Sequence, residues 1–207
     1  YSVTADVIRG CDTARWAREA EQQLAADGHN VTAYDHVIFV IPSTQLCGWE
    51  GLGSLACRTG CRVWIQGCDD VGVAAHEIGH NFGLRHAGSR VDDSEPFLEY
   101  RDPTSVMGNC WFGTGLVLAF NAPHMEQLEW VDAAHVAVAA ASGVHTLAPL
   151  DAFPELTGGR PQILKIAPRG TDYVYYISFF GNLNFVLAHH MLVHKSRGPA
   201  APSEYIN

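Results

Sequence analysis

The segment from His76 to His86 contains three histidines and one glutamate at spacings that suit a metal ion. On a helix, His76 and His80 lie one turn apart on the same face, so both imidazoles can bind one ion. His86 would face away from that ion in an unbroken helix, because six residues correspond to about 240° of rotation. Gly83 can end the helix before His86, since glycine readily adopts the left-handed conformation of such a turn.

Glu77 follows the first histidine and is expected to act on the substrate rather than to bind the metal. Three neutral imidazoles leave a zinc ion one coordination position for water, whose pKa the ion lowers towards neutrality. A nearby carboxylate can accept the proton as the oxygen attacks a carbonyl carbon, and can pass it to the departing amine. The pattern therefore predicts zinc-dependent hydrolysis of peptide bonds, with Glu77 as the general base.

Simpler interpretations of these histidines are surface or core residues of an ordinary helix, or ligands of a structural zinc ion. H-E-x-x-H alone is only suggestive, but a glycine and a third histidine at fixed spacing make the pattern specific. Structural zinc sites are normally closed by a fourth protein ligand, and none is evident beside this triad. Two rival functions stay open: a catalytically inactive zinc-containing binding or adhesion module, and a zinc amidase that acts on non-peptide amides.

The motif resembles that of the metzincin zinc metallopeptidases, and most closely that of the gametolysin-type peptidases, whose known members act on algal cell-wall glycoproteins. The resemblance rests on residues 75–87, 100–108, 121–124 and 128–130, and it is weak over the last 60 residues. Val106-Met107-Gly108 is similar to the Met-turn of these enzymes, in which a methionine lies beneath the zinc ligands. The resemblance implies the following roles: zinc ligands His76, His80 and His86, general base Glu77, and Met-turn residue Met107.

The resemblance also implies an α+β fold, namely a metzincin-like zincin catalytic domain with a twisted mixed β-sheet of four or five strands. The residue pattern predicts helices over residues 11–26, 71–82 and 123–131, and the resemblance implies that the first two span 11–27 and 70–82 and that the second is the zinc helix. In such enzymes the substrate lies extended along a sheet edge. Residues 51–66 are expected to form that edge.

After Gly143 the sequence changes to strand-like runs over residues 144–150, 162–167, 173–180 and 186–193. We therefore expect a catalytic domain over residues 1–143 and a small β-rich region over residues 144–207, which can continue beyond this chain. His189, His190 and His194 fall in or next to the last run. They are interpreted as structural or surface residues rather than as a second metal site.

Composition limits the partners. Thirteen Lys and Arg against 22 Asp and Glu give a net charge of −9, which argues against nucleic acid as a partner because phosphates attract positive surfaces. The longest apolar run, residues 136–141, has six residues, far short of the roughly 20 that span a bilayer, so no membrane insertion is expected. The expected partner is a protein or peptide substrate, with extracellular matrix or cell-wall glycoproteins as candidates. The sequence does not predict the oligomeric state.

The cysteines and one sequon favour a secreted protein, extracellular or in the cell wall. Six cysteines can form up to three disulfides in an exported protein, although they could instead be buried free thiols, or Cys57 and Cys61 could belong to a zinc knot. Asn30-Val31-Thr32 is a glycosylation sequon, which predicts a glycoprotein. The chain starts at Tyr1 without an export signal, so we expect any such signal or pro-segment to have been removed or left out.

Overall fold

The structure is a computed structural model that describes residues 10–43, 47–67, 71–90, 94–108, 119–181 and 190–206. The chain divides into two compact units, Tyr1–Gly83 and Leu84–Asn207. Each unit combines a mixed β-sheet with few helices, so the chain is α+β, as predicted. Within the described ranges, none of the helices has the length and apolar character needed to cross a bilayer.

The first unit contains a small mixed sheet. Its strands are β1 (His36–Ile41), β2 (Gly51–Gly53) and β3 (Cys61–Gln66), in the order β1-β3-β2. β3 runs parallel to β1 and antiparallel to β2, which leaves β2 at one edge. The described part of this unit therefore shows three strands rather than the four or five that were expected.

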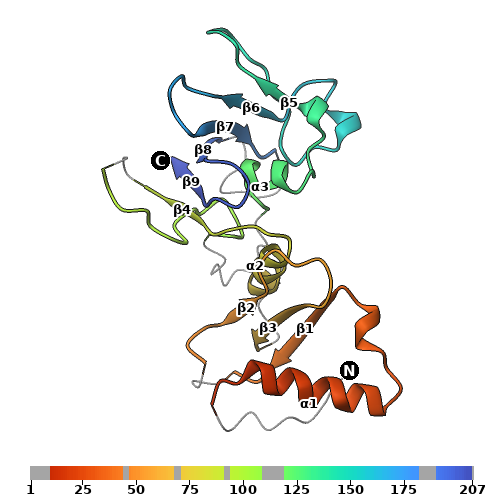
Figure 1. Cartoon of the computed structure of the whole chain (residues 1–207). Coiled ribbons are helices and arrows are strands. Elements are labelled where there is room, and N and C mark those ends of the chain that lie inside the picture. The colour runs from red at the N-terminus through yellow and green to blue at the C-terminus, as the bar shows by residue number, and fades with distance from the viewer. Residues whose placement is uncertain are drawn as a thin grey trace. The chain divides into compact units, whose positions relative to one another are not determined.

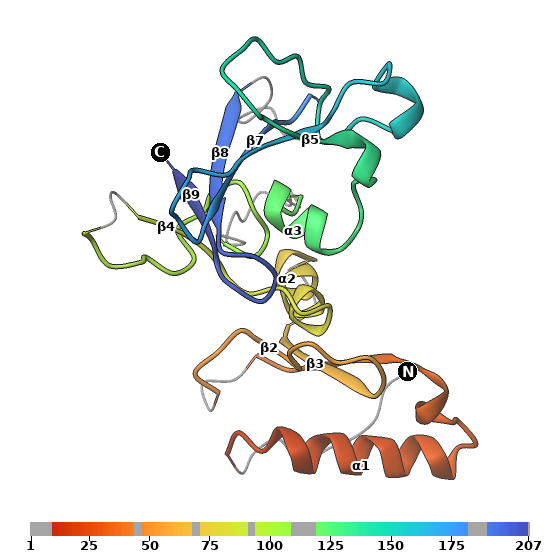
Figure 2. The same ribbon diagram turned by 45° about the horizontal axis from the view of Figure 1, so that its top comes forward.

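Two helices cover this sheet. Figure 1 and Figure 2 show it lying between α1 (Thr13–Ala26) and α2 (Val71–Asn81). At the start of α1, the side chain of Asp12 accepts a hydrogen bond of 2.9 Å from the backbone N–H of Arg15. Trp16 on α1 packs against Ile41 at the end of β1. Both helices were predicted within two residues of their observed ends.

Two disulfides close the loops of the first unit. They join Cys11 to Cys47 and Cys57 to Cys61. The prediction of disulfides is therefore confirmed for four cysteines, and the zinc-knot interpretation of Cys57 and Cys61 is wrong. Cys68 and Cys110 lie outside the described residues.

The second unit contains a six-stranded sheet with the order β4-β9-β8-β7-β6-β5. Parallel pairing joins β4 to β9 and β5 to β6, and the other neighbours are antiparallel. The strands are β4 (Ala87–Ser89), β5 (Val136–Val138), β6 (Ile163–Ile166), β7 (Val174–Phe179), β8 (Met191–Ser196) and β9 (Ser203–Ile206). Short 3-10 helices of both units are η1 (Val31–Ala33), η2 (Ala133–His135) and η3 (Pro154–Leu156).

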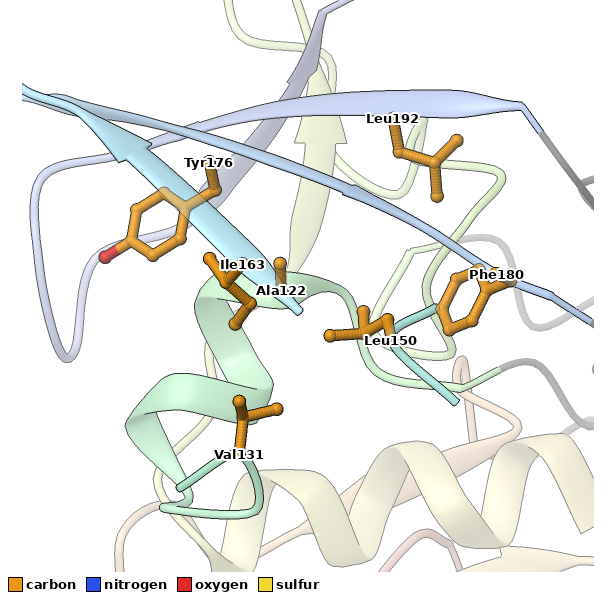
Figure 3. Packing of buried hydrophobic residues seen from close by; sticks show 7 residues of the cluster. All are labelled: Ala122, Val131, Leu150, Ile163, Tyr176, Phe180 and Leu192. Atoms are coloured by element: carbon orange, nitrogen blue, oxygen red, sulfur yellow. The ribbon is translucent and has the colours of Figure 1, made fainter. Parts of the chain in front are cut away.

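The core of the second unit forms between this sheet and the short helix α3 (Ala122–Gln127). Figure 3 shows the cluster, which comprises Ala122, Val131, Leu150, Ile163, Tyr176, Phe180 and Leu192. Asn121 begins α3, because its side-chain oxygen accepts a hydrogen bond from the backbone N–H of His124. Burial of a side chain such as Ile163 or Phe180 contributes about 1.5–3 kcal/mol, so this cluster stabilises the unit substantially.

The strands of the second unit match the sequence predictions in part. β6 and β7 confirm the runs at 162–167 and 173–180. The strand predicted over residues 144–150 is wrong. There, Ala148 N–H donates to Pro161 and Leu150 N–H to Phe179, so the segment makes separate bonds rather than a ladder.

The six-stranded sheet includes strands from both sides of the predicted boundary between residues 143 and 144. β4 and β9 come from opposite sides of residue 143 and pair through Ala87 and Ser203. The predicted boundary between residues 143 and 144 stays a prediction.

Candidate metal centre

The helix α2 brings the first two histidines together. The ring centroids of His76 and His80 lie 4.8 Å apart, with the rings nearly perpendicular. His76 is buried, and His80 is partly exposed. This is the arrangement expected for residues four apart on one helical face.

The helix ends where the sequence required a break. Asn81 is its last residue, and Gly83 has a φ of +90°. The carbonyl oxygens of His80 and Asn81 accept hydrogen bonds of 2.8 and 3.1 Å from the backbone N–H groups of Ala56 and Cys57. The loop after β2 thus satisfies carbonyls that the end of a helix leaves without intrahelical partners.

The third histidine completes a group of possible metal ligands. One ligand atom each from His76, His80 and His86 lies within 4.8 Å of the others, and all three belong to one continuous segment. In a tetrahedral zinc site with zinc–nitrogen bonds of about 2.0–2.1 Å, two ligand atoms lie roughly 3.3–3.4 Å apart, so the three side chains would have to move closer together to bind one ion. No other such group of three His, Cys, Asp or Glu residues occurs in the part of the chain that the structure describes.

An acidic residue lies behind the third histidine. The Nδ1 atom of His86 is 2.5 Å from Oε1 of Glu99, and the ring of Tyr100 is 4.1 Å from the imidazole, centroid to centroid. A carboxylate on one ring nitrogen fixes the tautomer and leaves the other nitrogen for a metal. The side chains around His86 therefore fit a metal ligand.

Glu99 is a residue of this site that the sequence did not predict. Metal-binding histidines usually donate their second N–H to a carboxylate or a carbonyl, so acidic residues near the motif were worth considering. Glu99 lies 13 residues after His86, beyond a turn-rich stretch without periodicity. No local pattern therefore indicates the contact.

Glu77 occupies a buried position beside the first histidine. Its side chain is 7% exposed. Burial raises the pKa of the Glu77 carboxyl to about 7, and a hydrogen bond from the backbone of Gly53 opposes this rise. A carboxyl group with such a pKa can both accept and release a proton near neutral pH.

The edge strand β2 fits around this glutamate because two of its three residues are glycines. A β-carbon on Gly51 would lie 2.5 Å from Oε1 of Glu77, and one on Gly53 would lie 2.5 Å from the Glu77 carbonyl oxygen. No ordinary side chain fits at those distances. The predicted role of residues 51–66 as a substrate edge stays a prediction, and β2 lies at an edge of the sheet.

Met107 lies in a buried turn that contacts the chain directly after His86. The carbonyl of Met107 accepts a hydrogen bond of 2.8 Å from the N–H of Ala87, and Gly108 N–H donates to Ser105. The Met107 side chain is fully buried. A β-carbon on Gly108 would lie 2.9 Å from the Ala87 carbonyl oxygen, so this close approach also needs glycine. The Met-turn role of Met107 stays a prediction.

Comparison with known proteins gives one relative and one family. A protein named Autolysin from Chlamydomonas reinhardtii is 37% identical over 98 residues, which are 45% of this chain and 14% of the relative. This chain thus covers only a small part of that relative's length. No solved structure matches. The sequence matches the family described as "Gametolysin peptidase M11" over residues 2–168, which is most of its length, and the chain therefore belongs to that family.

Proposed function

We propose that this chain contains the catalytic centre of a secreted zinc endopeptidase that hydrolyses peptide bonds in proteins. The observation that carries the proposal is the clustering of the ligand atoms of His76, His80 and His86 within 4.8 Å. The buried carboxyl of Glu77 adjoins this cluster in the sequence. Membership of a peptidase family supports the same reaction class.

The donor set suits zinc. Imidazole nitrogens are common zinc ligands, and a set of three with no fourth protein ligand, as found among the described residues, is typical of catalytic rather than structural sites. The carboxylate of Glu99 against His86 would fix the tautomer and the ring orientation of that ligand. In this assignment α2 is the zinc helix, the turn at Met107 is the Met-turn, and the fold is of the metzincin type.

The zinc ion and the residues around it would each have a separate role in the reaction. A bound zinc ion supplies Lewis acidity to water and to the substrate carbonyl. Glu77 takes the proton from the attacking water and later gives it to the leaving amine, which a pKa near 7 allows. The N–H of Gly53 orients the Glu77 carboxylate. An extended substrate would pair with the exposed edge of β2, since a free strand edge offers N–H and C=O groups.

We propose an extracellular or cell-wall location, with proteins or glycoproteins as substrates. The two disulfides support export, because such bonds persist in oxidising compartments. The substrate class rests on the resemblance to gametolysin-type peptidases, and the relative's name, Autolysin, is compatible with it.

Asn30 is the proposed glycosylation site of the secreted protein. The residue is exposed, and its side-chain oxygen accepts hydrogen bonds from the N–H and the hydroxyl of Thr32. When the protein is expressed through a secretory pathway, Thr32→Ser should keep a mass shift that an amidase for N-glycans removes, and Thr32→Ala should abolish it. A wild-type chain without that shift would contradict the assignment.

The test of the peptidase is cleavage of a mixed, quenched peptide library by the purified chain, before and after chelation and after return of zinc. We expect cleavage that disappears on chelation and returns with zinc. Hydrolysis of acylated sugars with no peptide cleavage would instead support the zinc amidase. A zinc-loaded, folded chain that cleaves neither would support the binding or adhesion module.

A further inference from the structure

The second unit contains a buried polar cluster that the proposed reaction does not use. Asp102 and Thr104, just before the turn at Met107, meet His194 on β8, and all three side chains are 0% exposed. The Nε2 atom of His194 lies 3.3 Å from Oδ2 of Asp102 and 2.9 Å from Oγ1 of Thr104. A polar strand residue thus replaces an apolar one in this core, on the same face as Leu192.

Asp102 is the centre of this cluster. Its Oδ1 atom accepts hydrogen bonds from the N–H and the hydroxyl of Thr104, and its Oδ2 atom accepts one of 2.9 Å from Asn121. Burial alone would raise the pKa of Asp102, but His194 and these donors outweigh burial and lower it. Removing one partner of such a buried pair is costly, because the other charge remains desolvated.

A second set of contacts leads from the cluster to β9. Asn121 Nδ2 lies 2.7 Å from the hydroxyl oxygen of Ser203, the first residue of β9. Ser203 is paired in the sheet with Ala87, the first residue of β4. Ala87 directly follows His86, so β9 contacts the backbone that carries the third histidine.

The turn at Met107 contacts both Asp102 and Ala87. The carbonyl oxygen of Asp102 would lie 2.2 Å from a β-carbon on Gly108, which places the two backbones in direct contact. The neighbouring Met107 carbonyl accepts the hydrogen bond from Ala87 N–H. Two series of contacts therefore connect the C-terminal strands to Ala87. One passes through Asp102 and the turn at Met107, and the other passes through β9.

We propose that His194 and Ser203 are positioning residues for the candidate metal centre, which fix the backbone at Ala87 and thereby the direction of His86. This inference rests on the proposed function. Both residues lie beyond residue 168, where the family match ends. The C-terminal strands would then be part of the catalytic structure rather than an appendage to it.

The experiment compares His194→Gln and Ser203→Ala with the control variant Met191→Leu. Met191 lies on β8, the strand of His194, and is 69% exposed. Three quantities are measured in the full chain: the zinc Kd by competition with a chelator, the hydrogen-exchange rate of the Ala87 amide without metal, and kcat and KM. We expect zinc binding to weaken about 10- to 100-fold in both variants, as for other residues that orient metal ligands. Exchange at Ala87 should accelerate, and the control should match wild type.

A double variant separates positioning from general stability. In His194→Gln, Asp102 keeps a buried charge without the imidazole beside it, whereas Asp102→Asn combined with His194→Gln removes that charge. The double variant should regain part of the zinc affinity lost by the single variant. If His194→Gln does not fold, Ser203→Ala and the double variant provide the same test.

Folded variants with wild-type zinc Kd and wild-type exchange at Ala87 would overturn the inference. A wild-type chain that binds no zinc would instead refute the proposed function. In that case exchange at Ala87 still reports whether His194 and Ser203 hold this backbone, so the two failures are distinguishable.

Discussion

Gly53 and Glu77 lie so close together that a β-carbon on Gly53 would be 2.5 Å from the carbonyl oxygen of Glu77 and 3.0 Å from its Oε2 atom. The backbone of Gly53 also forms a hydrogen bond with the Glu77 carboxylate. The position of the Glu77 carboxylate therefore depends on the backbone of β2. A substitution in β2 should therefore lower the reaction rate without altering the metal ligands.

Gly53→Ala should lower kcat more than tenfold while the chain keeps its zinc. The added methyl group meets backbone atoms of α2, which cannot move as a side chain would, and overpacking of this kind costs about 1–3 kcal/mol. Leu52→Ala is the matched control, because Leu52 is 38% exposed on the same strand. Steady-state kinetics and zinc content are measured together. A Gly53→Ala enzyme with wild-type kcat would show that this contact does not position Glu77.

Glu99→Gln should weaken zinc binding about 10- to 100-fold, because the amide cannot hold the His86 imidazole as a carboxylate does. Competition with a chromogenic chelator measures the Kd. Glu95→Gln, a change at an exposed acidic residue of the same segment, serves as the control. Equal zinc affinity in Glu99→Gln and wild type would show that Glu99 does not support zinc binding.

In the metal-free chain, the Glu77 carboxyl should titrate near pH 7, well above its ordinary value of 4.5. Because the pKa is raised on folding, the stability that this group contributes is present below pH 4.5 and is lost as pH rises through about 7. The free energy of unfolding of wild type relative to Glu77→Gln should therefore fall as the pH rises from about 4.5 to about 7. Denaturant titrations of both proteins at several pH values check this, and a constant difference would contradict it.

Asp102→Asn should show the opposite dependence on pH. The pKa of Asp102 is lowered on folding, so its contribution to stability is present above its ordinary value of 3.8 and is lost at lower pH. At pH 7 the variant should lose about 3–5 kcal/mol of unfolding free energy, since it breaks the buried pair that the Asp102 carboxylate forms with His194. The loss should shrink as the pH falls below about 4. A loss independent of pH would mean that the Asp102 charge does not stabilise the fold.

The local features of the site could be predicted from the sequence because they depend on short spacings. The helical spacing of His76 and His80 and the break at Gly83 follow from helix geometry and glycine conformation alone. The structure confirms both the helix and its end. α1 was predictable for the same reason, since Asp12 and Gly28 mark its ends.

Contacts between distant segments could not be predicted in this way. Glu99 contacts His86 across an irregular segment, and His194 contacts Asp102 at a separation of 92 residues in the sequence. The sequence placed His194 correctly among structural residues but not at the turn of Met107. Local patterns also do not show why glycine is needed at positions 51 and 53, which the approach of Glu77 explains.

The central claim is tested most directly by the turnover of Glu77→Gln with its zinc content determined in the same sample. The account predicts one zinc ion per chain in both proteins and a value of kcat at least about 10²-fold lower in the variant, because a glutamine cannot accept the proton. Chelation should abolish wild-type cleavage, and zinc should restore it. A zinc-loaded Glu77→Gln chain that cleaves peptides at the wild-type rate would contradict the account.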